Sequence, residues 1–142
     1  MTTALLDVNV LIALLDPNHT QHGRVHDWAT DELDGGWSTC AITQNGLVRI
    51  LSQPRYPNAV STPAAVELLR GATQHPRHEF WPCDLPLTDP SIIQERILGP
   101  NQITDVFLFA LAVAHGGRFV TLDRRIDASM VHGAPPAHLV LL

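Results

Sequence analysis

Residues 104–123 read TDVFLFALAVAHGGRFVTLD, and this stretch decides the fold. The segment 104–114 is apolar on every side once its first turn is passed, and such a helix is buried centrally instead of lying on a surface. Gly116-Gly117 ends that helix. Residues 118–122 then form a β-favouring run that leads directly into Asp123. A buried helix followed by a buried strand predicts an α/β fold.

The rest of the chain repeats this alternation of short strands and helices. Asn9 and Asp89 are predicted to cap the helices that follow them. The connection 53–63 is rich in proline. The pattern predicts an α/β fold with a mostly parallel sheet. The expected strands are 3–6, 37–40, 79–82, 118–122 and 138–142, and the expected helices are 8–15, 22–33, 41–52, 63–73, 89–98 and 104–114.

Composition excludes several classes of protein. With 142 residues, 45% hydrophobic and 16% charged, the chain is expected to fold as a single domain over residues 1–142 and not to be disordered. A formal charge of -5 argues against a basic nucleic-acid coat protein. It does not argue against an enzyme that holds a phosphodiester through metal ions, because a carboxylate cluster adds negative charge.

The same sequence bears on location. Cys40 and Cys83 are interpreted as reduced, buried thiols. No signal peptide is evident, and the longest apolar run, 106–114, is too short to cross a bilayer, which needs about 20 residues. We therefore expect a cytoplasmic protein without a membrane segment.

Three aspartates are the strongest candidates for chemistry. Asp7 and Asp123 each follow a predicted strand, and ligands of open α/β sheets bind beyond the carboxyl ends of the strands. Asp105 is the only ionisable residue of 103–114 and lies in the first turn of the buried helix. Converging carboxylates repel unless a cation joins them, and hard oxygen ligands suit Mg²⁺ or Mn²⁺. The alternative is that each aspartate only caps a helix or a turn.

At these residues the chain resembles a known family. The segments LLDVN (5–9), ITDVFL (103–108) and TLDRR (121–125) resemble the motifs of PIN domains, and most closely those of the VapC toxins of VapBC toxin–antitoxin modules. Residues 19–28, with paired histidines before Trp28, resemble one VapC subgroup. The resemblance covers essentially the whole chain.

The resemblance carries several implications. It implies an α/β/α sandwich and Mg²⁺-dependent endonucleolytic cleavage of RNA, with Mn²⁺ as a possible substitute. It makes Asp7, Asp105 and Asp123 the catalytic and metal-binding residues. It also implies a cognate VapB-type antitoxin that fills the active-site groove, and a homodimer. Together these describe the toxin of a type II toxin–antitoxin system.

One position departs from the family pattern. PIN domains usually place a further acid, commonly Glu, early in the helix after the second strand, and Gln44 stands there. Gln44 either holds a metal-bound water or only forms a hydrogen bond with the backbone. Asn9 likewise either orients a water or caps its helix. Arg124 and Arg125 either contact substrate phosphates or form an exposed turn.

The residues predict metal-assisted hydrolysis in which Asp7 and Asp105 are the main ligands. Asp123 would bind a second ion or orient the attacking water, and the products would be a 5′-phosphate and a 3′-hydroxyl. One alternative is a PIN-like module that binds RNA or an antitoxin with weak or no catalysis, because Gln44 replaces an acid. Another is a phosphatase-like enzyme with Asp7 as nucleophile, against which stand Asn9 and the lack of lysine.

Other candidates carry less support. His22 and His26 lie one helical turn apart, as zinc ligands can, but no third ligand is found at zinc-finger spacing. A nucleophile pair of Cys40 with His78 or His115 matches no motif. The apolar runs 11–15 and 47–51 are interpreted either as core or as a dimer surface.

Overall fold

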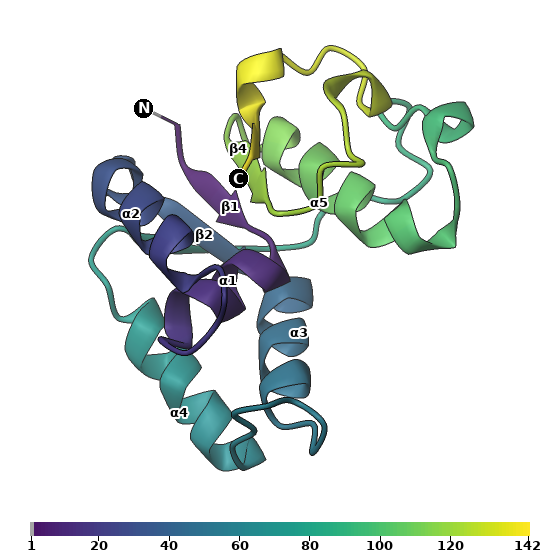
Figure 1. The fold of residues 1–142 in the computed structure, drawn as a ribbon. Helices are drawn as coiled ribbons and strands as arrows, with labels where there is room; N and C mark the ends of the chain where they lie inside the picture. Colours follow the sequence, from purple (N-terminus) through teal and green to yellow (C-terminus); the bar gives the residue numbers. More distant parts are fainter. Residues whose placement is uncertain (1) are drawn as a thin grey trace.

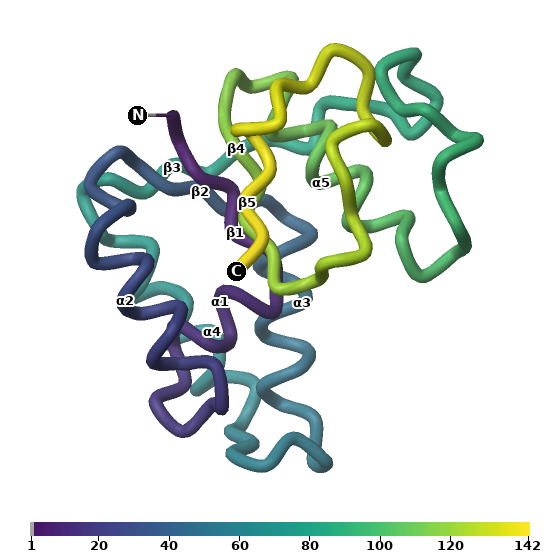
Figure 2. Tube along the Cα trace, turned by 45° about the horizontal axis from the view of Figure 1, so that its top comes forward, coloured from purple at the N-terminus to yellow at the C-terminus, as the bar shows by residue number. Residues whose placement is uncertain are grey.

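A five-stranded sheet forms the centre of the computed structural model, which describes residues 2–142. Its strand order is β3-β2-β1-β4-β5, and every neighbouring pair is parallel. Figure 2 shows the strands gathered in the middle of the molecule, with the chain crossing the sheet faces between them. This confirms the predicted parallel α/β fold. The strands are β1 (Ala4–Leu6), β2 (Trp37–Cys40), β3 (His78–Trp81), β4 (Arg118–Thr121) and β5 (Leu139–Leu141).

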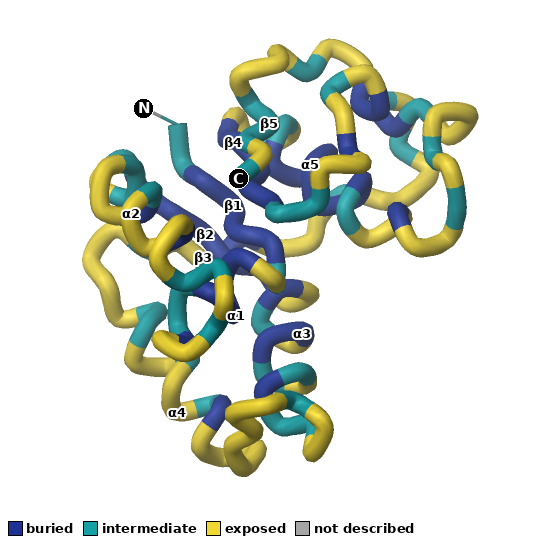
Figure 3. Tube along the Cα trace, viewed as in Figure 1, coloured by how far each residue is buried: buried dark blue, intermediate teal, exposed yellow. Residues whose placement is uncertain are grey.

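Helices cover both faces of the sheet (Figure 1). Successive side chains of a strand point to opposite faces, so Ala4 and Leu6 of β1 belong to one apolar core and Leu5 to the other. Figure 3 shows that the central strands are buried, whereas the outer surfaces of the peripheral helices are exposed. The result is the expected α/β/α sandwich. One face carries α1 (Val8–Leu15), α2 (His22–Glu32), α3 (Ala41–Leu51) and α4 (Thr62–Thr73), and the other carries α5 (Ile103–Ala114).

Helix α5 is the central helix that its sequence predicts. Every residue from Val106 to Ala112 is buried. The chain then turns at Gly116, where φ is +69°, and enters β4 at once. At Gly117 a Cβ atom would lie 2.5 Å from the Thr3 carbonyl oxygen and 2.6 Å from the Trp81 ring, so no side chain fits. The two glycines therefore allow β4 to lie directly beside β1.

The predicted helix at 89–98 is wrong. Asp89 closes a turn instead, its Oδ1 accepting the backbone N–H of Ser91 at 2.9 Å. Ile92 then forms an antiparallel bridge with Val131, and the Ile93 N–H donates to the Met130 carbonyl at 2.9 Å. Only a short 3₁₀ turn, Gln94–Arg96, remains helical. Pairing with a distant segment supplies the backbone hydrogen bonds that a helix would have supplied.

Two smaller expectations also change. Helix α1 is capped by Asp7, not by Asn9, which is exposed. Cys83 is exposed, whereas Cys40 is buried as expected. The apolar runs 11–15 and 47–51 place Leu11, Ile12, Leu47 and Leu51 in the core, as the core interpretation predicts. Among residues 2–142, no helix has the length and apolar character needed to cross a membrane.

Candidate active site

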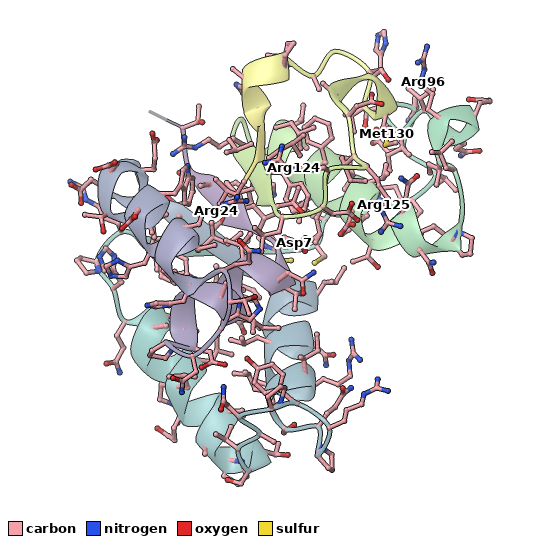
Figure 4. All side chains as sticks on the ribbon, viewed as in Figure 1. Asp7, Arg24, Arg96, Arg124, Arg125 and Met130 are labelled. Carbon is pink, nitrogen blue, oxygen red and sulfur yellow. The ribbon has the colours of Figure 1, made fainter. Side chains whose placement is uncertain are left out.

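The candidate site lies where the strand order reverses. From β1 the chain moves outward through β2 and β3, whereas β4 returns to the other side of β1 and is followed by β5. Open α/β sheets bind ligands at such a switch point, beyond the carboxyl ends of the strands. Asp7 directly follows β1, and its N–H donates to the carbonyl of Val120 in β4 at 3.0 Å. In Figure 4 Asp7 is near the centre of the view, with Arg124 and Arg125 drawn near it from the segment after β4.

Asp7 is buried and held on both oxygens. Only 5% of its surface is exposed. Its Oδ1 accepts the Val8 N–H at 2.7 Å, which caps α1, and its Oδ2 accepts the Thr121 hydroxyl at 2.7 Å. Burial raises the pKa of Asp7 above its ordinary value, and the charge of Asp123 adds to the rise. Asp7 therefore does cap α1, and the same hydrogen bonds fix its carboxylate at the edge of the sheet.

Asp105 interacts with both other carboxylates. It is partly buried in the first turn of α5. Burial raises the pKa of Asp105 to about 7, and the charges of Asp7 and Asp123, with a hydrogen bond to Asp123, contribute to the rise. The structure thus brings together the three aspartates that the sequence singles out.

Asp123 is the carboxylate of the cluster that a cation already holds. Arg125 donates to it through Nε at 3.0 Å, Nη2 at 2.8 Å and the backbone N–H at 3.0 Å. These hydrogen bonds lower the pKa of Asp123 to about 2. The Asp123 N–H in turn donates to the Thr121 Oγ1 at 3.0 Å, so Thr121 links Asp7 and Asp123. Sequence reasoning missed Thr121, although a hydroxyl two residues before a candidate ligand is a readable signal.

The two arginines after Asp123 therefore differ. Arg125 pairs with Asp123, and its pKa is raised by that carboxylate. Arg124 is exposed and has no ion pair with any residue of the described part of the chain. Of the two predicted phosphate contacts, Arg124 is the one that the protein leaves available.

The donor set fits a divalent cation, although its present arrangement is not that of a metal site. Within residues 2–142, no group of three or more His, Cys, Asp or Glu side chains is placed as a ligand set. Asp123 is instead turned onto Arg125, and the raised pKa of Asp105 favours its protonated form. Carboxylate oxygens are the ligands that Mg²⁺ and Mn²⁺ prefer, and a bound cation would offset the same excess negative charge.

Gln44 lies on α3. Within residues 2–142 its side chain forms no hydrogen bond with any of the three aspartates, Asp7, Asp105 and Asp123. Its Nε2 donates to the Thr39 Oγ1 at 3.0 Å, and that hydroxyl is 2.8 Å from the His78 Nε2. The amide is thus held by a side chain of β2 and not by the backbone. This arrangement fastens α3 to the sheet beside the site.

The side chains of the weaker alternatives have other partners. His22 Nδ1 bonds to the Ala13 carbonyl at 2.7 Å, which anchors α2 to α1. His115 stacks on Trp81 and pairs with Asp84. The Cys40 thiol is buried, which raises its pKa, and it neighbours Thr43. None of these contacts builds a zinc site or a Cys–His pair.

Comparison with known proteins assigns the family. Residues 4–129 match the PIN domain model. The chain belongs to the PIN domain family. Ribonuclease VapC44 of Mycobacterium tuberculosis is 51% identical over 140 residues, which cover 98% of this chain and 99% of that protein. Ribonuclease VapC39 of the same organism is 42% identical over 133 residues, covering 92% of this chain and 96% of that protein. The predicted kinship of this PIN domain with VapC proteins is confirmed.

A solved structure supports the fold of this PIN domain. The structure of VapBC2 from Rickettsia felis, bound to a DNA fragment from the promoter, superposes with a TM-score of 0.60. It covers 99% of this chain and 97% of that chain at 14% sequence identity. At that identity the likeness bears on the fold alone. The names of the relatives agree with the predicted ribonuclease class.

Proposed function

We propose that this PIN domain is a metal-dependent endoribonuclease, the toxin of a VapBC-type toxin–antitoxin module, and that it acts in the cytoplasm. The observation that carries the proposal is the meeting of Asp7, Asp105 and Asp123 at the switch point of the sheet, where burial, together with the charges of Asp7 and Asp123, raises the pKa of Asp105 to about 7. The ribonuclease names of its VapC relatives support the substrate class.

In this proposal Asp7, Asp105 and Asp123 hold Mg²⁺, for which Mn²⁺ can substitute. When bound, the ion lowers the pKa of a water and neutralises charge on the phosphoryl oxygens. Thr121 keeps Asp7 and Asp123 in register, and Arg125 keeps the Asp123 carboxylate ionised. Hydrolysis leaves a 5′-phosphate and a 3′-hydroxyl.

Exposed polar side chains near the three aspartates are the proposed contacts for substrate and water. Arg124, exposed beside Asp123, contacts a phosphate of the RNA in this proposal. Asn9 is exposed two residues after Asp7 and can bind a water there. A cognate VapB-type antitoxin is the protein partner, and it blocks the same edge of the sheet.

A second candidate function is a PIN domain that binds RNA or antitoxin with weak catalysis. The observation that favours it is the environment of Gln44. Its neutral amide donates a hydrogen bond to Thr39 and adds no carboxylate to the three aspartates. A neutral amide contributes less than a carboxylate to binding a hard cation. The rate of cleavage relative to the Gln44→Glu variant separates the two functions.

A homodimer is also part of the proposal. Leu87 and Ile103 are 52% and 41% exposed, and they form an apolar patch between two hollows of about 190 and 240 Å³. Exposed apolar side chains that gather in one place mark a contact surface. A Leu87→Glu variant should sediment as a monomer and the wild type as a dimer. A monomeric wild type would refute the proposed homodimer.

The decisive experiment sequences the 5′ ends of RNA incubated with purified protein, with and without Mg²⁺. We expect new 5′-phosphorylated ends that require the ion and vanish in the Asp7→Asn variant. The Asp31→Asn variant, which removes an exposed carboxylate from α2, serves as control and should cleave normally. Equal cleavage by wild type and Asp7→Asn would refute the proposal.

A further inference from the structure

A groove of about 400 Å³ lies along α3. Its wall includes Val8, which directly follows Asp7, and Thr104, which directly precedes Asp105, so the groove adjoins the candidate active site, although none of the three aspartates lines it. Its volume lies within the range of about 300–1,000 Å³ that is typical of ligand pockets. The remaining lining residues all come from α3 and are Ala41, Ile42, Asn45, Gly46 and Arg49.

The groove depends on a close approach between α3 and α1. A Cβ atom at Gly46 would lie 2.7 Å from the Val8 Cγ2, so the two helices can meet here only because residue 46 has no side chain. One residue away, Asn45 and Arg49 are spaced by four positions and share a face of α3, about 6 Å apart along its axis. The groove therefore has an apolar wall at Val8 and a polar wall at these two residues.

Arg49 is a cation with no charged partner in the described part of the chain. Three other arginines form ion pairs, namely Arg70 with Glu67, Arg118 with Glu32 and Arg125 with Asp123. The Arg49 guanidinium is exposed and forms neither an ion pair nor a side-chain hydrogen bond within residues 2–142.

This free charge has a physical use in a protein of net charge -5. The carboxylates repel a phosphodiester, and a guanidinium in the adjoining groove offers a bidentate donor to phosphate. The competing explanation is purely structural, because Arg49 lies in the last turn of α3, where a cation stabilises the helix dipole.

We propose that Asn45 and Arg49 form a phosphate-binding subsite for the RNA strand, next to the cleaved bond, while Val8 and Ile42 contact the adjoining sugar or base. The proposal rests on the proposed ribonuclease function and adds to it the path of the substrate. RNA is favoured over an acidic segment of a protein partner because the wall of the groove includes Val8 and Thr104, the chain neighbours of Asp7 and Asp105. An RNA strand bound at the aspartates for cleavage must extend away from them, and the groove along α3 offers one path for it.

The test measures binding of a fluorescent single-stranded RNA to the purified protein with a metal chelator present, so that no cleavage occurs. We expect Arg49→Ala to weaken binding about tenfold at low salt. The slope of log K against log salt concentration should fall in magnitude by about 0.7, the value for one phosphate contact on a single strand. Arg49→Lys should recover part of the affinity, and Asn45→Ala should weaken binding without changing the salt slope.

Arg55→Ala is the matched control, because Arg55 is exposed just beyond α3, donates a hydrogen bond to the Gln53 side chain and does not line the groove. Equal affinities and slopes for Arg49→Ala and Arg55→Ala would overturn the proposal. So would a loss of antitoxin binding with unchanged RNA binding. If Arg49→Ala fails to fold, Arg49→Gln provides the same comparison. Absence of Mg²⁺-dependent cleavage by wild type would refute the ribonuclease function, whereas the metal-free affinities still decide the subsite.

Discussion

Replacement of Asp105 by asparagine should stabilise the metal-free protein and abolish its cleavage of RNA. The pKa of Asp105 is about 7 in the folded protein against an ordinary value of 3.8. Between these values the folded state keeps a proton that the unfolded state has lost. The free energy of unfolding therefore falls as the pH rises through this window. An asparagine side chain cannot ionise, so the variant escapes that loss.

The size of the effect follows from the same shift. A pKa difference of this magnitude corresponds to at most about 4 kcal/mol, and solvent screening at a partly exposed site reduces it to about 1–3 kcal/mol. Asp7, whose pKa is also raised, acts in the same direction, whereas His78, whose pKa is lowered chiefly by burial, acts in the opposite one. The contribution of His78 largely cancels when the variant is subtracted from wild type.

Urea denaturation with a chelator, at pH 5 and at pH 8, measures the difference. We expect similar stabilities at pH 5 and a more stable Asp105→Asn variant at pH 8. Adding Mg²⁺ at pH 8 should stabilise wild type and leave the variant nearly unchanged, because ligand binding to the folded state adds to stability. Asp31→Asn, on the exposed surface of α2, should follow wild type at both pH values. An identical pH dependence in wild type and Asp105→Asn would refute the electrostatic coupling of the three aspartates.

Three further substitutions test neighbouring contacts. Gly46→Ala should lower the free energy of unfolding, measured in urea, by about 1–3 kcal/mol, because its Cβ would lie 2.7 Å from the Val8 side chain. The control Gly71→Ala, which lies in open space on α4, should be neutral or stabilising. Thr121→Val removes the hydroxyl that binds Asp7, so it should slow cleavage and move its acid limb to higher pH. Gln44→Glu should raise the Mg²⁺-dependent rate, and an unchanged rate would leave Gln44 with the purely structural contact to Thr39.

The parts of the fold that sequence predicts are those decided by local patterns. Helix α5 is apolar on every side, and only burial between the sheet and its covering segments accommodates such a surface. The aspartates after β1 and β4 are readable because parallel strands end at one edge of a sheet. Their adjacency also requires that β1 and β4 be neighbours, and strand order is a property of the whole chain.

The errors have a common physical origin in contacts between distant residues. Residues 89–98 carry a helix-like start, yet Ile92 pairs with Val131, and no local pattern reports that pairing. Helical phase predicts that Gln44 points inward, but not that Thr39 of the preceding strand meets its amide. Arg49 reads as an ordinary exposed charge until α1 and α3 are packed together and a groove lies beside it.

The carboxylate cluster shows how a protein can keep a charge arrangement that opposes its own folding. Three nearby carboxylates cost stability, and here the cost is reduced in two ways, by protonation of Asp105 at a pH below its raised pKa and by the pairing of Arg125 with Asp123. Each of these also competes with a divalent cation, since binding must displace the proton and loosen the arginine. In the proposed function, affinity for the ion should therefore rise with pH, and the same aspartates that destabilise the metal-free fold would supply its binding energy.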